Sequence, residues 1–318
     1  MKNPKVILLG SIALCFGLSL FQSEINPYYY QIIIYIGINI ILATSLNLIN
    51  GFAGQFSLGH AGFLAIGAYT ASMITTTLHT TPNDAISYII FPLALILGGV
   101  TAAIAGLIVG IPSLRLKGDY LAITTLGFGE IIRVVIQNMD FVGGARGLTG
   151  IPKISNFFWV FSFVAIAIFI ISNLINSTYG KGFLSVRDDE IAAQAMGINT
   201  TKYKVIAFVT GAFFAGMAGG LYAHFISYIT PQQFGFIKSI EIVVMVVVGG
   251  MGNTLGIVIA AILLTILPEA LRGVAEYRMV IYSLMLIIIM ISRPQGIFGT
   301  GLSFRKFLRG MKQSKAST

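Results

Sequence analysis

The sequence has few charged residues, one cysteine and three histidines. Only 10% of its 318 residues are charged, whereas about a quarter are charged in a typical soluble domain. With 56% hydrophobic residues and a mean hydropathy of +0.88, this composition excludes an ordinary soluble globular domain. The single cysteine, Cys15, excludes an intrachain disulfide, and we expect neither a metal site nor a catalytic site. The composition therefore predicts a protein that crosses a membrane several times.

The spans are expected to be helices, because a bilayer core about 30 Å thick offers no partner for open strand edges. A helix needs roughly 20 apolar residues to cross that distance. The apolar runs cover residues 6–21, 29–49, 61–78, 88–110, 120–137, 157–176, 205–223, 239–267 and 280–291. We predict an all-α integral membrane protein in which the first run is a retained helix.

The run 239–267 is long enough to be one span or two. If the chain turns at "GGMGN", residues 249–253, there are about ten spanning or partly spanning helices and both termini are cytoplasmic. The inside then holds fourteen Lys and Arg residues and the outside five, whereas nine spans divide them ten to nine. Cytoplasmic loops carry the excess of positive charge, so we favour ten segments, with residues 239–250 either a full span or a half-helix. The net charge of +9 then indicates contact with anionic membrane lipid and not with nucleic acid.

One polar stretch, residues 177–204, interrupts the apolar runs and contains three consecutive acids, Asp188, Asp189 and Glu190. Ser185 lies three residues before the first acid, which fits a helix N-cap, and the helix dipole favours acids in the first turn. We therefore predict one short cytoplasmic helix over residues 186–196. Gly197 suits its left-handed C-cap, and Asn199 to Thr201 can begin the next helix.

The predicted helix offers small residues and one flexible apolar contact. Ala192 and Ala193 permit close approach, and Met196 adapts to a partner surface. The alternative is a helix that lies on the membrane surface. Such helices prefer Lys and Arg on their polar face, whereas this one begins with three acids that anionic lipid repels. We therefore favour a helix that docks a protein.

Several motifs resemble one known family in the order in which they occur. They are "NLINGFAGQFSLGHAGFLAIGAYTAS", "GDYLAITTLGFGEIIRVVIQN", "GGARGLTGIP", "RDDEIAAQAMGIN", "GGMGNTLG" and "RPQGIFG", and they extend from Asn47 almost to the tail. Together they resemble the permeases of branched-chain amino acid ABC importers. "EIAAQAMGI" is similar to the cytoplasmic coupling loop of such permeases, although Ile191 separates its Glu from its Ala pair.

The resemblance implies three kinds of partner and a division of labour. It implies a second homologous permease subunit, two cytoplasmic ATP-binding subunits, and a periplasmic or extracellular substrate-binding protein. The sequence has no complete G-x-x-x-x-G-K-[ST] phosphate loop: "YGKGF" lacks the upstream glycine and "GGMGNT" lacks the lysine. We expect no cofactor on this chain, with ATP hydrolysed by the partners. The expected ATPase-coupling residues are Arg187, Asp188, Asp189, Glu190, Ala192, Ala193, Met196 and Gly197.

The segment "GFAGQFSLGHAGF", residues 51–63, carries polar side chains between two apolar runs. Its glycines allow non-helical backbone, which at membrane depth is tolerated only against protein or a water-filled cavity. Gln55, Ser57 and His60 are therefore candidates for the substrate pathway. Small residues also serve tight helix packing, and His60 can equally be a structural hydrogen-bonding group.

Glu130 and Arg133 are charged residues inside a predicted span, three positions apart and so on one helical face. Charge in the bilayer is costly unless paired, so an ion pair is expected. The two groups can bind the ends of a zwitterionic amino acid, or form a structural pair. Lys238 and Glu241 lie near the end of their span, where snorkelling to the interface suffices.

These expectations describe a non-enzymatic transport subunit in the bacterial inner membrane. Residues 1–300 form one permease domain, with the coupling loop at 177–204, and residues 301–318 form a basic cytoplasmic tail. The expected function is inward transport of leucine, isoleucine and valine by alternating access coupled to partner ATPases. A permease for urea or short amides is the alternative within this class, and an ion-gradient-driven transporter or channel is the alternative outside it.

Overall fold

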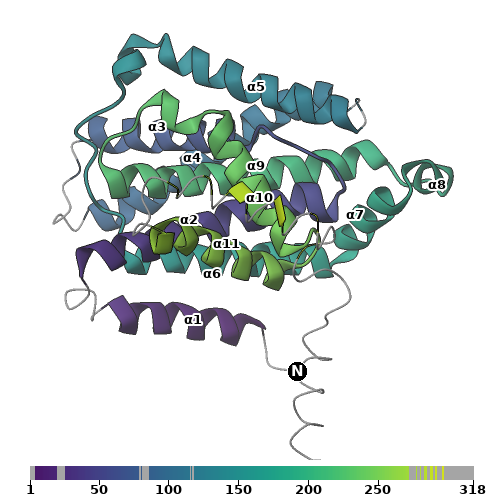
Figure 1. Ribbon diagram of the computed structural model, residues 1–318, viewed down its shortest axis with the longest axis horizontal. Coiled ribbons are helices and arrows are strands. Elements are labelled where there is room, and N and C mark those ends of the chain that lie inside the picture. The colour runs from purple at the N-terminus through teal and green to yellow at the C-terminus, as the bar shows by residue number, and fades with distance from the viewer. Residues whose placement is uncertain are drawn as a thin grey trace, which may run out of the picture.

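A computed structural model describes residues 4–19, 26–78, 80, 86–114, 116 and 118–271, with isolated positions between 277 and 296. Within these residues the regular structure is helical, and the structure shows no strand there beyond one isolated bridge between Leu148 and Ile229. The helices lie as a layered bundle (Figure 1). They are α1 Pro4–Ser19, α2 Pro27–Asn47, α3 His60–Thr77, α4 Ser87–Ser113, α5 Asp119–Gln137, α6 Phe157–Asn176, α7 Thr178–Asp188, α8 Glu190–Ala195, α9 Thr200–Ile226, α10 Phe236–Gly249 and α11 Thr254–Ala270.

Five of the described helical segments are long and apolar enough to cross a membrane: Pro27–Phe52, Ser87–Ser113, Phe157–Asn176, Thr200–Ile226 and Pro231–Gly249. The protein is therefore an all-α, multi-pass membrane protein. The number of ten segments and the cytoplasmic placement of both termini stay predictions. Half of the residues of the expected last span, 280–291, lie outside the described residues, and the tail 301–318 lies wholly outside them.

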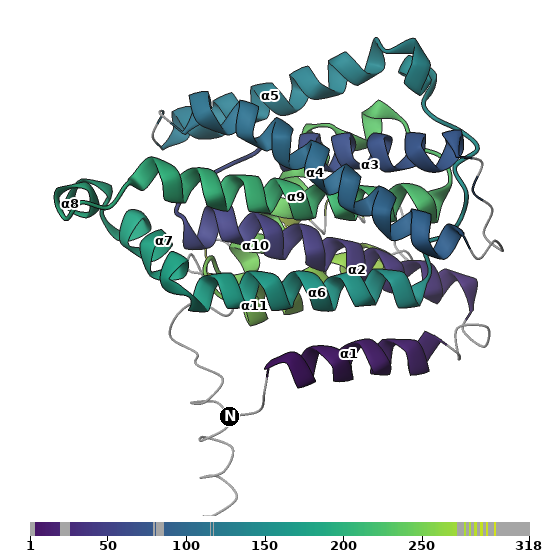
Figure 2. The same cartoon turned by 180° about the vertical axis from the view of Figure 1, so that it is seen from behind.

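Helix α9 occupies the centre of the bundle. It packs against α3 and α4 on one side and against α2 on the other, and α6, α11 and α10 pack around α2 (Figure 2). The helices approach closely through small residues, as is usual in membranes. A Cβ atom placed on Gly67 of α3 would lie 2.1 Å from the carbonyl oxygen of Gly216 on α9, so only glycine fits there.

The chain departs from regular helix where glycine was expected to allow it. Helix α2 runs into a π-helical turn, Leu48–Phe52, and irregular backbone then leads to α3 at His60. Side chains form hydrogen bonds with backbone groups of this segment that lack helical partners, as burial in a membrane requires. Asn50 Oδ1 accepts the Ser57 N–H at 3.1 Å, and Thr125 Oγ1 accepts the Leu58 N–H at 3.0 Å. The predicted departure from helix within residues 51–63 is confirmed for residues 53–59, whereas residues 60–63 belong to α3.

The turn at "GGMGN" is also confirmed. Helix α10 ends at Gly249 and α11 begins at Thr254, with the Asn253 side chain capping α11 by accepting the Gly256 N–H at 3.2 Å. Helix α10 has 14 residues, which corresponds to a rise of about 21 Å. By itself it is shorter than a bilayer core, and a 3₁₀ turn, Pro231–Phe234, precedes it.

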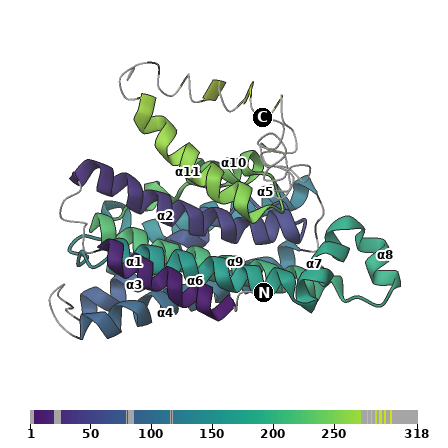
Figure 3. The same cartoon turned by 90° about the horizontal axis from the view of Figure 1, so that it is seen from below.

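The polar stretch forms a helical hairpin that projects from one end of the bundle, as all views show (Figure 3). The prediction of a single helix over residues 186–196 is wrong. Helix α7 continues to Asp188, the chain breaks at Asp189, and α8 covers only Glu190–Ala195. The reason is that Asp189 and not Ser185 is the N-cap, while Ser185 Oγ donates to the Lys181 carbonyl inside α7 at 3.0 Å.

The contact between α3 and α9 can be tested with one methyl group. We expect Gly67→Ala to lower the melting temperature of the detergent-solubilised protein by several degrees, because overpacking costs about 1–3 kcal/mol. Gly127→Ala is the matched control, since a Cβ at Gly127 in α5 would meet nothing within 4 Å. That change should leave thermal stability equal or slightly higher. Equal melting temperatures for the two variants would contradict the packing described here.

Candidate functional site

Helix α8 is short and is fixed by capping at both ends. Asp189 Oδ1 accepts the N–H groups of Ile191 and Ala192 at 2.9 and 3.0 Å. At the other end Gly197 adopts a φ of +81°, and the N–H of Ile198 donates to the Ala193 carbonyl at 3.0 Å. This is the Schellman pattern, for which glycine is favoured because it reaches positive φ without strain. The expected C-cap at Gly197 is confirmed.

The three acids have three different environments. Asp189 caps α8, and Asp188 is exposed and pairs with Arg187 at 3.0 Å. Glu190 instead turns toward α9, where its Oε1 accepts a hydrogen bond from Lys204 Nζ at 2.6 Å. The Lys204 side chain is only 4% exposed, so this pair attaches α8 to the first turns of α9. Sequence reasoning missed Lys204, because a pairing over fourteen residues depends on how the hairpin folds back.

The tip of the hairpin presents apolar side chains to the outside. Ile191 is 72% exposed and Met196 is 82% exposed, and Ala192 lies exposed between them. Ala193 is buried within the hairpin, so it supports this surface and does not form it. Exposed apolar patches rimmed by polar groups can mark contacts with another protein or with a membrane.

Arg187 joins the hairpin to the bundle. Its Nη1 donates to the Gly51 carbonyl in the π-helical turn at 3.3 Å, while its Nε and Nη2 hold Asp188. From the same region Asn47 Oδ1 accepts the Gly252 N–H in the α10–α11 turn at 2.8 Å. The end of α7, the π-helical turn and the α10–α11 turn therefore meet at one junction. We call these contacts, made by Arg187, Gly51, Asn47 and Gly252, the hairpin junction.

The candidate pathway residues lie inside the bundle. Ser57 and His60 are fully buried and Gln55 is 8% exposed. His60 Nε2 and Ser45 Oγ share a hydrogen bond of 2.8 Å, which fits the alternative of a structural histidine. His60 Nδ1 and Ser57 Oγ have no partner among the described residues. Whether these side chains line a pathway stays a prediction.

The structure places Glu130 and Arg133 in an ion pair, with Oε2 and Nε 2.7 Å apart. Glu130 Oε1 also accepts the Phe236 N–H at the first turn of α10, at 3.0 Å. The second pair, Lys238 and Glu241, lies 3.0 Å apart on α10, and both pairs border one cavity. The sequence interpretation treated Lys238 and Glu241 as snorkelling residues. It did not predict that they border the same cavity as Glu130 and Arg133.

This cavity has a volume of about 540 Å³. Its charged side chains are 21–36% exposed, so they are partly withdrawn from solvent. We call it the charged hollow. It is lined by Glu130, Arg133, Gln232, Gln233, Gly235, Phe236, Ile237, Lys238 and Glu241. A cue in the sequence was available: each helix carries one acid and one base three positions apart, and Gly235 breaks the chain just before the second pair.

A second cavity of about 280 Å³ is also lined by Lys238 and Glu241. Its polar groups include Asn39, whose Oδ1 lies 3.4 Å from Lys238 Nζ. Its apolar walls are Ile38, Leu42, Leu64 and Leu264. Charged groups and aliphatic walls thus adjoin in the same part of the bundle. Among the described residues, no three His, Cys, Asp or Glu side chains are placed to hold a metal ion.

Comparison with known proteins gives consistent matches. Residues 28–290 match the family described as the permease component of branched-chain amino acid transport systems. The high-affinity branched-chain amino acid permease protein LivM of Escherichia coli K12 is 35% identical over 295 residues, which cover 82% of this chain and 67% of LivM. The LivM protein of Salmonella typhimurium matches equally well. The ribose import permease RbsC of Haemophilus influenzae is 26% identical over 302 residues, covering 85% of this chain and 87% of RbsC. No solved structure matches the chain.

The attachment of α8 to α9 can be tested by removing the charge of Glu190, the partner of the buried Lys204 ammonium. We expect Glu190→Gln to speed hydrogen exchange of the amides in residues 190–198, because an unsatisfied buried group costs on the order of 1–3 kcal/mol. That cost corresponds to roughly 5- to 150-fold faster local opening. Lys202→Gln, an exposed cation in the same region, should leave exchange unchanged. Unaltered protection in Glu190→Gln would show that the pair does not hold the hairpin.

Proposed function

The chain belongs to the family of branched-chain amino acid transport permease components, and we propose that it carries leucine, isoleucine and valine inward as one subunit of an ATP-driven importer. As a permease component it is a transport subunit that crosses the membrane several times. The proposed location is the bacterial inner membrane. The proposed partners are a second homologous permease chain, two cytoplasmic ATP-binding subunits and a substrate-binding protein on the opposite side.

The observation that carries the proposal is the hairpin junction. Ile191 and Met196 offer an exposed apolar surface to the ATP-binding subunits, and the caps and the Glu190–Lys204 pair make α8 a rigid unit. Movement of this unit reaches the bundle through Arg187, which is bonded to the Gly51 carbonyl. The junction lies where α2 ends and α10 turns into α11, so displacement there re-orients both helices.

This arrangement suits alternating access. Packed helices shift between discrete arrangements and do not deform continuously, so a small displacement at a junction can select one of two states. ATP binding and hydrolysis in the partners supply the free energy that biases the two states. The unpartnered Ser57 Oγ and His60 Nδ1 support a second arrangement, because buried polar atoms without partners are rare in a resting structure.

The charged hollow supports an amino-acid substrate. Ionisable groups within a membrane bundle face its interior or a water-filled cavity and do not face lipid. The α5–α10 surface that carries them is therefore proposed to face the second permease subunit, with the substrate path between the two chains. Arg133 and Lys238 can receive a carboxylate, and Glu130 and Glu241 an ammonium group, as a zwitterion requires. Urea and short amides are neutral, so binding them does not require two opposite charges.

The coupling role of Arg187 is tested by Arg187→Ala in vesicles that contain the reconstituted complex. We expect ATP hydrolysis to persist while leucine uptake falls at least about tenfold, since one charge-assisted hydrogen bond contributes roughly 1.5–3 kcal/mol. Arg187→Lys should restore part of the uptake, and Lys202→Ala should behave as the parent. Full coupled uptake with Arg187→Ala would contradict the junction's role. Uptake by the chain alone without nucleotide would favour a gradient-driven transporter.

The substrate role of the charged hollow is tested by Arg133→Gln. We expect the KM for leucine uptake to rise roughly tenfold or more, because a carboxylate loses a charged partner. The measurement is initial uptake rate against substrate concentration, with Lys181→Gln as an exposed control. A lower melting temperature with an unchanged KM would instead identify the Glu130–Arg133 pair as structural.

A further inference from the structure

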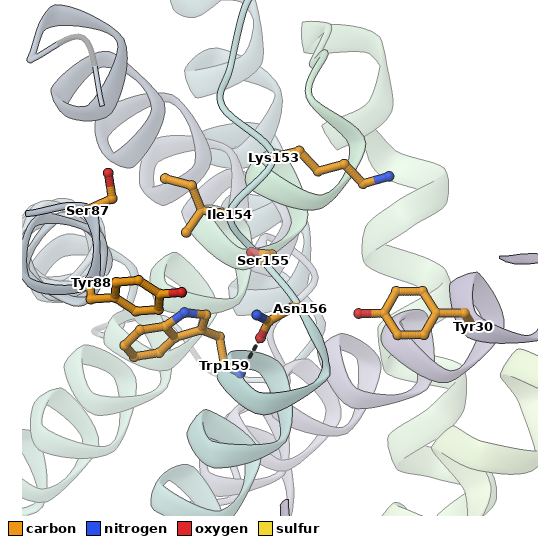
Figure 4. A pocket seen from close by; sticks show the side chains of 8 residues that line it. All are labelled: Tyr30, Ser87, Tyr88, Lys153, Ile154, Ser155, Asn156 and Trp159. Atoms are coloured by element: carbon orange, nitrogen blue, oxygen red, sulfur yellow. Dashed lines mark hydrogen bonds between the residues drawn. The ribbon is translucent and has the colours of Figure 1, made fainter. Parts of the chain in front are cut away.

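A third cavity lies at the end of the bundle opposite the α7–α8 hairpin. It has a volume of about 230 Å³, and the close-up shows side chains from three parts of the chain around it (Figure 4). Its lining comes from the first turns of α2, α4 and α6 and from the loop before α6. The residues are Tyr30, Ser87, Tyr88, Lys153, Ile154, Ser155, Asn156 and Trp159. The hairpin follows the C-terminal end of α6, whereas this cavity lies at its N-terminal end.

The electrostatic character of this cavity is positive. Lys153 is the only charged side chain among the described residues that line it. Its ammonium lies 5.6 Å from the centre of the Phe225 ring, and the structure gives it no carboxylate partner within the described part of the chain. Three helices direct their N-terminal ends toward the cavity, and helix N-termini carry partial positive charge.

Ser155 provides a second and independent observation. Its residue is only 4% exposed, and its Oγ has no hydrogen-bond partner among the described residues. Ser155 lies between Lys153 and Asn156 on the loop that lines the cavity (Figure 4). A buried hydroxyl without a hydrogen-bond partner costs free energy. In a native structure such a group is expected to have a partner that the described residues do not supply. An anionic oxygen accepts from a hydroxyl, an ammonium and an amide at once.

The surroundings favour a lipid over a larger soluble ligand. Tyr30, Tyr88 and Trp159 are aromatic groups of the kind that gather at the membrane–water interface. Below them, α4 presents exposed apolar side chains at Ile89 and Leu93. The cavity is smaller than the roughly 300–1,000 Å³ typical of small-molecule sites, which suits a headgroup better than a whole metabolite.

We propose that the cavity between the N-terminal ends of α2, α4 and α6 binds the phosphate of an anionic phospholipid headgroup, through Lys153 and the Ser155 hydroxyl. The acyl chains lie along the exposed face of α4 that begins at Tyr88. The site is separate from the charged hollow, whose lining shares no residue with it. The proposal depends on the membrane location of the chain and not on its transport substrate.

The test uses the full chain in detergent and follows its melting temperature during titration with phosphatidylglycerol. We expect a stabilising shift in the parent protein. In Ser155→Ala the lipid concentration for half the shift should rise roughly three- to tenfold, the effect of one hydrogen bond. Without lipid, this variant should be as stable as the parent or more so, because it removes an unsatisfied hydroxyl. Lys153→Gln should weaken binding at least as much, and Lys181→Gln should not.

Two further titrations identify the source of the anion. Diacylglycerol has acyl chains without a phosphate and should give no shift that depends on Ser155 or Lys153. Inorganic phosphate tests for a free anion. If inorganic phosphate gives the variant-dependent shift and phosphatidylglycerol gives no further shift in its presence, the same site is assigned to a free anion instead of a lipid. A phosphatidylglycerol shift that is identical in the parent, Ser155→Ala and Lys153→Gln overturns the proposal. A variant-dependent shift with diacylglycerol overturns it as well.

Discussion

The bond between the Arg187 guanidinium and the Gly51 carbonyl is the contact on which the proposed coupling depends. It requires two departures from regular structure. Helix α2 must loosen into a π-helical turn, which makes the Gly51 carbonyl available to a side chain, and α7 must end at that level. In a membrane each such departure has to be compensated by hydrogen bonds from neighbouring segments. Asn47, Asn50 and Thr125 provide them, so the irregular backbone is a built part of the bundle.

The same constraint explains where charge is found. Apart from the hairpin and its junction, the ion pairs of the described residues gather around the charged hollow, on helices α5 and α10. Neither pair is sealed in the core, and both remain partly exposed on one side of the bundle. Lipid cannot solvate them there, which gives that side a role different from the apolar faces of α4 and α6.

Much of the fold could be predicted from sequence, because membrane burial leaves few options. The helical class, the break after Gly51, the turn at residues 249–253 and the cap at Gly197 followed from apolar runs and glycine positions. The break at Asp189 could not be predicted in this way. Asp188, Asp189 and Glu190 are adjacent acids, and only the path of the chain decides which one caps a helix.

Contacts between distant segments were the other limit. The pairing of Glu190 with Lys204 and the meeting of Glu130 with the first turn of α10 join residues that no local pattern connects. The candidates Gln55, Ser57 and His60 were identified by residue type, but their burial could not be read from spacing. Local rules located the unusual segments correctly, and tertiary packing determined which side chains face each other.

The central claim is that the tip of the α7–α8 hairpin contacts an ATP-hydrolysing partner. Cys15 is the only cysteine, so its replacement by serine permits a single cysteine at position 196. With Met196→Cys, cross-linking in the assembled complex should join the chain to an ATP-binding subunit, whereas Ile237→Cys, equally exposed on the bundle, should not. Absence of that product, or labelling of position 196 by an impermeant thiol reagent from outside the cell, would contradict the account.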